Sequence, residues 1–187
     1  KTLTNAMENL HKKEKLEHMN QILSDLYVRD SVTGLYNRMG YQKLSISYFT
    51  IMREKKMPVL VMFIDLDRLK YINDTFGHEY GDFAIVSIAK AMLKHCDADA
   101  IAARTGGDEF IVLEGAKDEE SGRVLAQKIR TELSKTQRAM QLPFDLSASI
   151  GAVVAHPGEE NVLESYVKRA EMLMYEEKAE KKVSRDS

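Results

Sequence analysis

The chain has 187 residues, of which 44% are hydrophobic and 30% are charged, and its formal net charge is −2. This balance fits one globular domain with an appendage, and it argues against nucleic acid or an anionic membrane surface as a partner. No apolar stretch approaches the roughly 20 residues that span a bilayer, and no signal peptide is visible. We therefore expect a cytoplasmic location without direct membrane insertion. The single cysteine, Cys96, fits a reducing compartment.

Residues 1–29 lack glycine and proline and are predicted to form a helical stalk. Apolar residues recur at intervals of three and four in two runs that are out of phase, Leu3, Met7, Leu10 and then Leu16, Met19, Leu23, Leu26. So thin an apolar stripe favours a coiled coil between two chains over a solvated helix docked on its own domain. The phase break would allow two alternative registers. The chain begins at Lys1, so we expect a piece of a longer protein, which could be membrane-anchored.

From residue 37 onward, apolar periodicity predicts alternating helices and strands. Asn37 can cap a helix that ends near Lys55, and the apolar run from Val59 to Ile64 predicts a strand buried on both faces. The later elements, in chain order, are helices at 68–76 and 79–94, a hairpin at 100–115, a helix at 118–136, a strand at 144–155 and a helix at 161–180. This order predicts an α+β fold, an α/β sandwich in which a mainly antiparallel sheet is flanked by helices.

Two acidic residues follow a pair of glycines within the predicted hairpin, in the string Thr105-Gly106-Gly107-Asp108-Glu109-Phe110. A Gly-Gly pair supplies the positive φ angles that a two-residue hairpin turn demands. A turn without side chains leaves room for a ligand against the backbone. Because carboxylates hold divalent metal ions, the string suggests phosphate chemistry. The alternative is an ordinary turn with solvated acidic side chains.

A second acidic pair, Asp65 and Asp67, ends the buried strand that begins at Val59. The period of two along a strand sends both side chains to the same face. Carboxylates at such a strand end lie at a sheet edge, where α/β proteins bind ligands. If the strand and the hairpin are neighbours, Asp65 approaches Asp108 or Glu109. The three carboxylates would then form a site for one or two Mg²⁺ ions.

These segments together resemble the GGDEF-domain diguanylate cyclases over residues 28–182. The motifs that carry the resemblance are the run from Asp30 to Arg38, the segment from Asp65 to Asp82, the string at 106–110, Ser149-Ile150-Gly151-Ala152, and the helix from Ala170 to Lys178. The resemblance implies a catalytic domain at 30–182 with the palm-like arrangement of nucleotidyl cyclases. Residues 1–29 would then be the end of a helix from an upstream sensor, and residues 183–187 a C-terminal tail.

The resemblance further implies the condensation of two GTP into cyclic di-GMP with release of two pyrophosphates. The implied metal ions are Mg²⁺, or Mn²⁺, held by the carboxylates of Asp65, Asp108 and Glu109 and by the Leu66 carbonyl. The ions would lower the pKa of the attacking 3′-hydroxyl and neutralise the triphosphate. Glu109 and a metal-bound water remain alternatives as proton acceptor. Because one domain binds one GTP, catalysis needs a homodimer, which the N-terminal helix would hold together.

The remaining site residues are also carried over from the resemblance. Asn73 and Asp82 match the guanine-reading positions, where a carboxylate accepts from guanine N1 and N2 but leaves adenine unpaired. The residues assigned to the phosphates or to the substrate side of the loops are Lys70, Lys178, Lys182, His78, Gly106 and Gly107. Lys182 departs from the usual arginine, so we expect weaker triphosphate binding. We expect Lys181 to lie in a solvated helix turn and Arg104 to position the hairpin.

An inhibitory motif of the family, Arg-x-x-Asp just before the hairpin, is absent, because this chain has Asp97-Ala98-Asp99-Ala100 there. Feedback by product through that site is therefore not expected. Two other functions remain as alternatives: a degenerate module that only binds GTP or cyclic di-GMP, and a domain that serves chiefly for dimerisation. The intact carboxylates at 65, 108 and 109 favour the enzyme over both, since binding alone does not demand all three.

Overall fold

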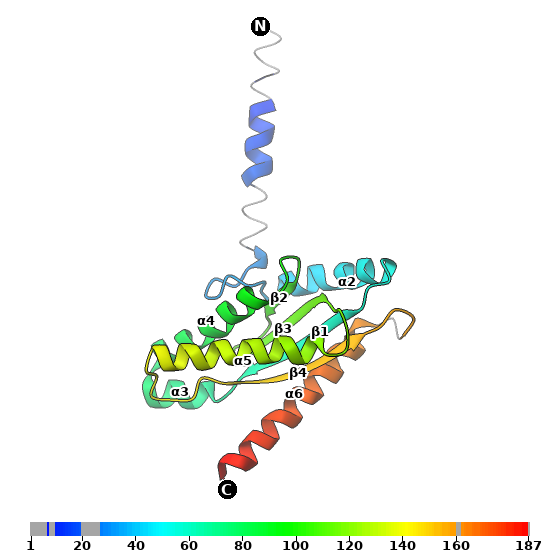
Figure 1. The fold of residues 1–187 in the computed structure, drawn as a ribbon. Helices are drawn as coiled ribbons and strands as arrows, with labels where there is room; N and C mark the ends of the chain where they lie inside the picture. The colour runs from blue at the N-terminus through cyan, green and yellow to red at the C-terminus, as the bar shows by residue number, and fades with distance from the viewer. Residues whose placement is uncertain (1–6, 8–9, 20–26, 160–161, 187) are drawn as a thin grey trace.

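The computed structural model describes residues 7, 10–19, 27–159 and 162–186. Its core is a four-stranded sheet in the order β2-β3-β1-β4, in which every neighbouring pair is antiparallel (Figure 1). The strands are β1 (Val59–Leu66), β2 (Ile101–Arg104), β3 (Glu109–Gly115) and β4 (Ala148–Ala155). The helices are α2 (Arg38–Glu54), α3 (Leu69–Phe76), α4 (His78–His95), α5 (Ser121–Ala139) and α6 (Leu163–Asp186). This arrangement confirms the predicted α+β fold.

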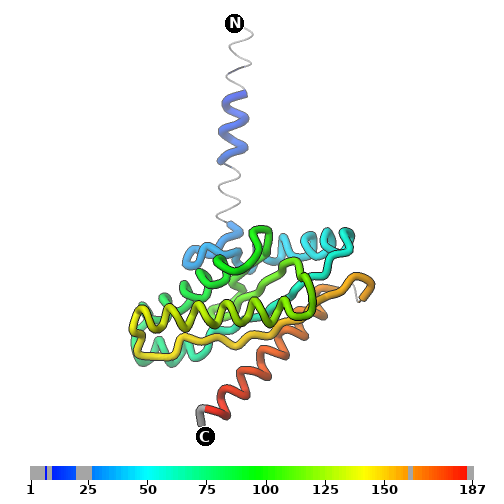
Figure 2. Tube along the Cα trace, in the orientation of Figure 1, coloured from blue at the N-terminus to red at the C-terminus, as the bar shows by residue number. Residues whose placement is uncertain are grey.

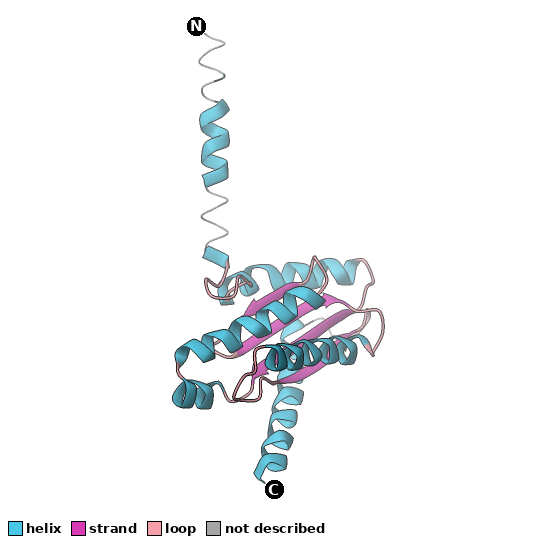
Figure 3. Ribbon diagram, turned by 60° about the vertical axis from the view of Figure 1, so that its left-hand side comes forward, coloured by secondary structure: helices cyan, strands magenta, loops and turns pink. Residues whose placement is uncertain are grey.

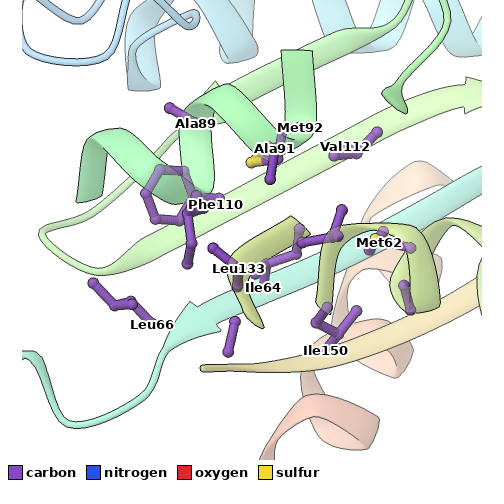
Figure 4. Close-up of a cluster of buried hydrophobic side chains, with 14 of the residues drawn as sticks. Met62, Ile64, Leu66, Ala89, Ala91, Met92, Phe110, Val112, Leu133 and Ile150 are labelled. Carbon is purple, nitrogen blue, oxygen red and sulfur yellow. The ribbon is translucent and has the colours of Figure 1, made fainter. Parts of the chain in front are cut away.

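Helices cover both faces of the sheet (Figure 3). Even-numbered residues of β1, such as Met62 and Ile64, pack against Met92 of α4 and Leu133 of α5 (Figure 4). Odd-numbered residues, such as Phe63, pack against α2 and α6. The strand is therefore apolar at every position from Val59 to Ile64 because both of its faces are covered. The same alternation directs Asp65, the next odd position, toward the α6 face.

The predicted boundaries hold to within a few residues for most elements. Asn37 caps α2 as expected, its side chain accepting a hydrogen bond from the Gly40 N–H at 2.9 Å. The strand predicted at 144–155 begins only at Ala148, although Phe144 and Leu146 are buried in the loop before it. The sequence predicts that the last helix ends near residue 180, but this helix continues to Asp186. No glycine or proline follows Gly158 to end this helix earlier.

Residues 10–19 are helical, as the stalk prediction requires. The side chains of Met7, Leu10, Leu16 and Met19 are all more than half exposed. The remaining apolar positions of the predicted stripe, Leu3, Leu23 and Leu26, lie outside the described residues. Dimerisation through this segment stays a prediction. In the part of the chain that the structure describes, no helix combines the length and apolar character of a membrane span.

Helix α6 crosses β4 at very close range, and the two lie side by side in Figure 2. Gly151 permits this approach: a Cβ atom there would lie 1.9 Å from the Ala170 carbonyl oxygen and 2.5 Å from the Met174 nitrogen. Both contacts are to backbone, which cannot turn aside as a side chain can. The position of α6, and of the lysines on it, therefore depends on a glycine in β4.

Replacing Gly151 with alanine should destabilise the protein by more than about 2 kcal/mol, because α6 must shift away from the sheet. Chemical denaturation with a matched Gly107→Ala variant measures this effect. A Cβ atom at Gly107 meets nothing within 4 Å, so that variant should unfold like the parent chain. Equal stability of the two variants would contradict the close packing of α6 on β4.

Candidate active site

The candidate site lies where β1 ends beside the β2–β3 hairpin and under α6. Asp65 is paired with Glu109 in β3 and with Ser149 in β4. The Leu66 N–H donates a hydrogen bond of 2.9 Å to the Asp108 carbonyl, which ties the hairpin turn to the end of β1. Antiparallel pairing thus brings Asp65, Asp108 and Glu109 to one end of the sheet. Asp65 and Asp67 both interact with α6, in keeping with the expectation that they share a face.

Asp65 is only 5% exposed and forms an ion pair with Lys178 of α6, whose Nζ lies 2.7 Å from Oδ1. Burial raises the pKa of Asp65, and the nearby charges of Asp108 and Asp67 raise it further, although Lys178 opposes both effects. Burial lowers the pKa of Lys178, but its hydrogen bond to Asp65 and the surrounding carboxylates raise it above the ordinary value. The lysine therefore stays charged, and one ammonium group balances a cluster of carboxylates only in part.

Asp67 belongs to a separate network that fixes α6 to β4. Its carboxylate accepts hydrogen bonds of 2.7 Å from the hydroxyls of Ser147 and Ser149 and lies 3.1 Å from Lys181 Nζ. Lys181 also donates to the Ala148 carbonyl at 2.7 Å and pairs with Glu177. Burial raises the pKa of Asp67, but the serine hydroxyls and Lys181 outweigh it and hold the pKa below its ordinary value.

The expectation that Lys181 lies in a solvated turn is therefore wrong. A helix of this length reaches back over the sheet, and its last turns meet the buried carboxylate of Asp67 instead of water. Sequence reasoning missed this network. The available signal was the alternation of Ser147 and Ser149 before the apolar part of β4, which places two hydroxyls on the α6 face.

The turn between β2 and β3 differs from the one predicted. It has four residues, 105–108, and the glycines with positive φ in the described chain are Gly34, Gly77 and Gly158. The hypothesis that Gly106 and Gly107 supply positive φ angles is therefore wrong. The structure gives Gly106 a different feature: a Cβ atom there would lie 2.7 Å from Glu109 Oε2, so the Glu109 side chain would have to turn away. Gly107 has open space on its Cβ side, which leaves this part of the backbone accessible.

Arg104 holds the turn and connects it to the start of the domain. Its guanidinium donates to the Gly107 carbonyl at 2.8 Å and pairs with Asp30 at 3.3 Å. Asp30 in turn accepts hydrogen bonds from the amide and hydroxyl of Thr33. Burial raises the pKa of Asp30, but the bonds from Thr33 and the charge of Arg104 hold it below its ordinary value.

A further contact joins this region to the residues that precede it. The side-chain amide of Asn37, which caps α2, also donates to the carbonyls of Tyr27 at 2.8 Å and Arg29 at 3.1 Å. The Tyr36 carbonyl accepts from the Arg104 N–H at 2.8 Å, so Tyr36 covers the outer edge of β2. The junction with the predicted stalk is thus hydrogen-bonded to both α2 and the strand that leads into the turn.

The two predicted guanine-reading residues lie on neighbouring helices. Asn73 is on α3 and Asp82, which is exposed, follows Gly81 on α4. A Cβ atom at Gly81 would lie 1.9 Å from Asn73 Oδ1, so the two helices touch at this point. The other residues predicted to contact substrate are exposed: Lys70 on α3, His78 at the start of α4, and Lys182 on α6. Among the described residues, the His78 side chain has no hydrogen-bond partner.

The carboxylates at 65, 108 and 109 were predicted to hold metal. In the described chain no three Asp, Glu, His or Cys side chains are gathered closely enough to hold an ion as they stand. Their chemistry nevertheless fits a divalent cation. The donors are hard oxygens, and the charge of Asp108 disfavours ionisation of the buried Asp65, which a cation would relieve. The three carboxylates therefore suit Mg²⁺. In this structure Asp65, the most buried of them, is paired with Lys178.

A groove of about 690 Å³ lies nearby, between α2 and the start of α6. Its floor includes Phe49, Phe63 and Ile111, and Thr105 and Glu109 line it beside the hairpin. Asp65 and Lys178 do not line this groove. The carboxylate cluster therefore lies at the margin of the groove, with Glu109 as the shared residue.

Comparison with known proteins identifies the family. Residues 27–184 match the family model described as diguanylate cyclase, GGDEF domain. The diguanylate cyclase VdcA of Vibrio cholerae is 34% identical over 80% of this chain, and the match spans 43% of VdcA. The cyclic di-GMP phosphodiesterase NbdA of Pseudomonas aeruginosa is 27% identical over 88% of this chain and 21% of its own length. The chain thus spans less than half of these relatives.

The fold matches as well. The crystal structure of the coiled coil and GGDEF domain of DgcB from Caulobacter crescentus, in complex with c-di-GMP, has a TM-score of 0.76 to this chain. That comparison covers 94% of this chain and 93% of DgcB at 22% identity, and it concerns the fold alone. The family match over most of the sequence is the stronger finding. This chain belongs to the GGDEF-domain diguanylate cyclase family.

Proposed function

We propose that this chain is an active diguanylate cyclase domain that condenses two GTP into cyclic di-GMP and two pyrophosphates. The observation that supports the proposal is that strand pairing brings Asp65, Asp108 and Glu109, from β1 and the hairpin, to one end of the sheet, where Lys178 of α6 pairs with Asp65. Acidic groups that repel one another in a partly buried site are stabilised by a bound cation. A domain that only bound nucleotide would not need this combination.

The reaction requires a 3′-hydroxyl to attack an α-phosphorus while pyrophosphate leaves. Mg²⁺, or Mn²⁺, when bound, supplies positive charge that lowers the pKa of the hydroxyl and neutralises the triphosphate. The carboxylates of Asp65, Asp108 and Glu109 and the Leu66 carbonyl are the groups that would hold it. The open backbone at Gly107 leaves room for phosphate oxygens beside the turn, as its lack of Cβ contacts suggests.

Three lysines would hold the phosphates: Lys70, Lys178 and Lys182. Lys182 supplies a single ammonium where the family has a two-pronged guanidinium, which favours weaker triphosphate binding over loss of activity. Glu109 and a water molecule remain the two candidates for the proton acceptor. The place of the Glu109 carboxylate beside Gly106 at the turn supports it as one of the two.

The base would be read by Asn73 and Asp82, with His78 on the substrate side of the same loop. Guanine presents donors at N1 and N2, where adenine has an acceptor at N1 and only a C–H at position 2. An exposed carboxylate at Asp82 can accept from both, and the Asn73 amide can donate and accept. The close contact of α3 and α4 at Gly81 supports a fixed spacing between these two side chains.

Each product molecule contains two guanosines, so two domains must face each other. We propose that the helix at the N-terminus holds this homodimer, with an upstream sensor in the full-length protein. The exposed apolar side chains of Met7, Leu10, Leu16 and Met19 support a partner helix. The catalytic unit would comprise residues 30–182. Tethering by the stalk would raise the effective concentration of the second domain and set its orientation.

Three observations favour a second function, that of a catalytically weak module that binds GTP or cyclic di-GMP for regulation or dimerisation. Lys178 interacts with Asp65 directly, and Lys182 replaces an arginine. A related protein with a matching segment, NbdA, is named a phosphodiesterase. Turnover of GTP separates this function from the cyclase.

Purified protein should convert radiolabelled GTP and Mg²⁺ into cyclic di-GMP, and Asp108→Asn should lower the rate by at least about a hundredfold. The loss follows from removing a charge that would hold the cation. Asp118→Asn is the matched control, because Asp118 is an exposed aspartate beyond the other end of β3. Chromatography of the labelled products gives the rates. Absence of cyclic di-GMP from the parent chain would leave the binding module as the function.

Asp82→Ser should relax the preference for GTP over ATP by about 2 kcal/mol, roughly 30-fold in relative kcat/KM. Serine cannot accept hydrogen bonds from both guanine donors, so the variant binds GTP less well. The variant also has no charged acceptor that would remain unpaired when ATP binds. Competition between labelled GTP and ATP measures the ratio. Unchanged selectivity in the variant would show that Asp82 does not read the base.

Cyclic di-GMP should inhibit this enzyme only by competing with GTP. The position of the missing Arg-x-x-Asp motif is acidic instead: Glu114 is 8% exposed and accepts a hydrogen bond from the Asp97 N–H at 2.9 Å. Burial raises the pKa of Glu114, and the charges of Asp97 and Asp99 raise it further. Asp97 and Asp99 themselves are exposed, and their negative charges disfavour a phosphate at this position. Initial rates at rising GTP test the pattern, and tight non-competitive inhibition would contradict it.

A further inference from the structure

The two lysines that reach the carboxylate cluster from α6 are held very differently. Lys181 contacts Asp67, Glu177 and the Ala148 carbonyl, and the buried network around it fixes its position. Lys178 has Asp65 as its one hydrogen-bond partner within the described chain. Its side chain is 40% exposed, whereas that of Asp65 is 6% exposed. The lysine can therefore leave toward solvent by rotating its flexible stem, while the carboxylate cannot.

We propose that Lys178 is the resident cation of Asp65 in the nucleotide-free protein, that it competes with a divalent metal ion for this carboxylate, and that it is released to the phosphates of an incoming nucleotide. This inference rests on the proposed function for the identity of the nucleotide. It adds that metal and nucleotide bind cooperatively, because each favours the same displacement of one side chain.

The electrostatics of the site couple the release of Lys178 from Asp65 to the binding of the divalent cation. Asp65 faces the charges of Asp108 and Asp67, so losing Lys178 without a replacement would leave a buried carboxylate uncompensated. A divalent cation supplies that replacement. Conversely, the ammonium of Lys178 loses its partner when the cation binds, and the triphosphate of a bound nucleotide would offer it a new anion. Lys178 thus passes from a protein carboxylate to a substrate phosphate.

Competition of this kind weakens metal binding by a calculable factor. If the ion pair is populated in roughly nine of ten molecules, the apparent dissociation constant for the metal rises about tenfold. A nucleotide that holds Lys178 away from Asp65 removes this penalty. By reciprocity, the metal strengthens nucleotide binding by the same factor. The nucleotide-free protein should therefore bind metal weakly even though its carboxylates are in place.

The test is a titration of the nucleotide-free protein with Mn²⁺, in which free Mn²⁺ is measured by electron paramagnetic resonance. Lys178→Met should tighten Mn²⁺ binding about tenfold, because the competitor is gone. Lys182→Met is the matched control: it removes the same charge from the next turn of α6, where the lysine is exposed and has no ion pair within the described chain. It should leave the affinity close to that of the parent.

Equal Mn²⁺ affinity in the parent and Lys178→Met proteins would overturn the inference, as would an equal gain in Lys182→Met. Lys178→Gln, which keeps a polar side chain, replaces the methionine variant if the latter does not fold. The readout is independent of turnover. A protein that makes no cyclic di-GMP but shows the Lys178 effect would overturn the proposed function alone. A protein that is active but shows no effect would overturn this inference alone.

Discussion

The structure depends on β1, a buried strand that carries the Asp65 carboxylate near its C-terminal end. All residues of β1 are buried, and the strand is hydrogen-bonded to β3 on one side and to β4 on the other. Apolar packing on both faces holds the strand in register, because a slip by one residue would move every side chain to the opposite face of the sheet. That constraint fixes Asp65 against Glu109 and under α6. A carboxylate held there cannot reach bulk water, so its partners must come from the protein or from a ligand.

Helix α6 supplies those partners and also closes the fold. Gly151 admits its backbone onto β4, and the Asp67–Lys181 network holds its later turns. Packing and electrostatics thus both position α6. The apolar contacts of Tyr166, Ala170 and Met174 hold it against the sheet, and the ion pairs of its lysines hold its C-terminal turns. The site requires both, since a small shift of α6 would separate Lys178 from Asp65.

Much of the fold and part of the candidate site could be predicted from the sequence. The run from Val59 to Ile64 is apolar without alternation, which indicates a strand covered on both faces, and Asn37 has the side chain that a helix start requires. The turn at 105–108 could not be predicted correctly, because local propensity suggests positive φ for paired glycines, whereas neither glycine has it here and Gly106 instead lies close to the Glu109 carboxylate. The role of Lys181 was equally hidden. Its partners lie far away along the chain, and only the crossing of α6 over β4 brings them together.

The hydrogen bonds around Asn37 and Arg104 have a mechanical consequence. The carbonyls of Tyr27 and Arg29, the start of α2, the edge of β2 and the turn at Gly107 are joined by short bonds with no flexible spacer between them. A rotation of residues 27–29 would therefore be passed through these bonds to the turn at 105–108. In the proposed homodimer, such a rotation would change the angle between the two domains.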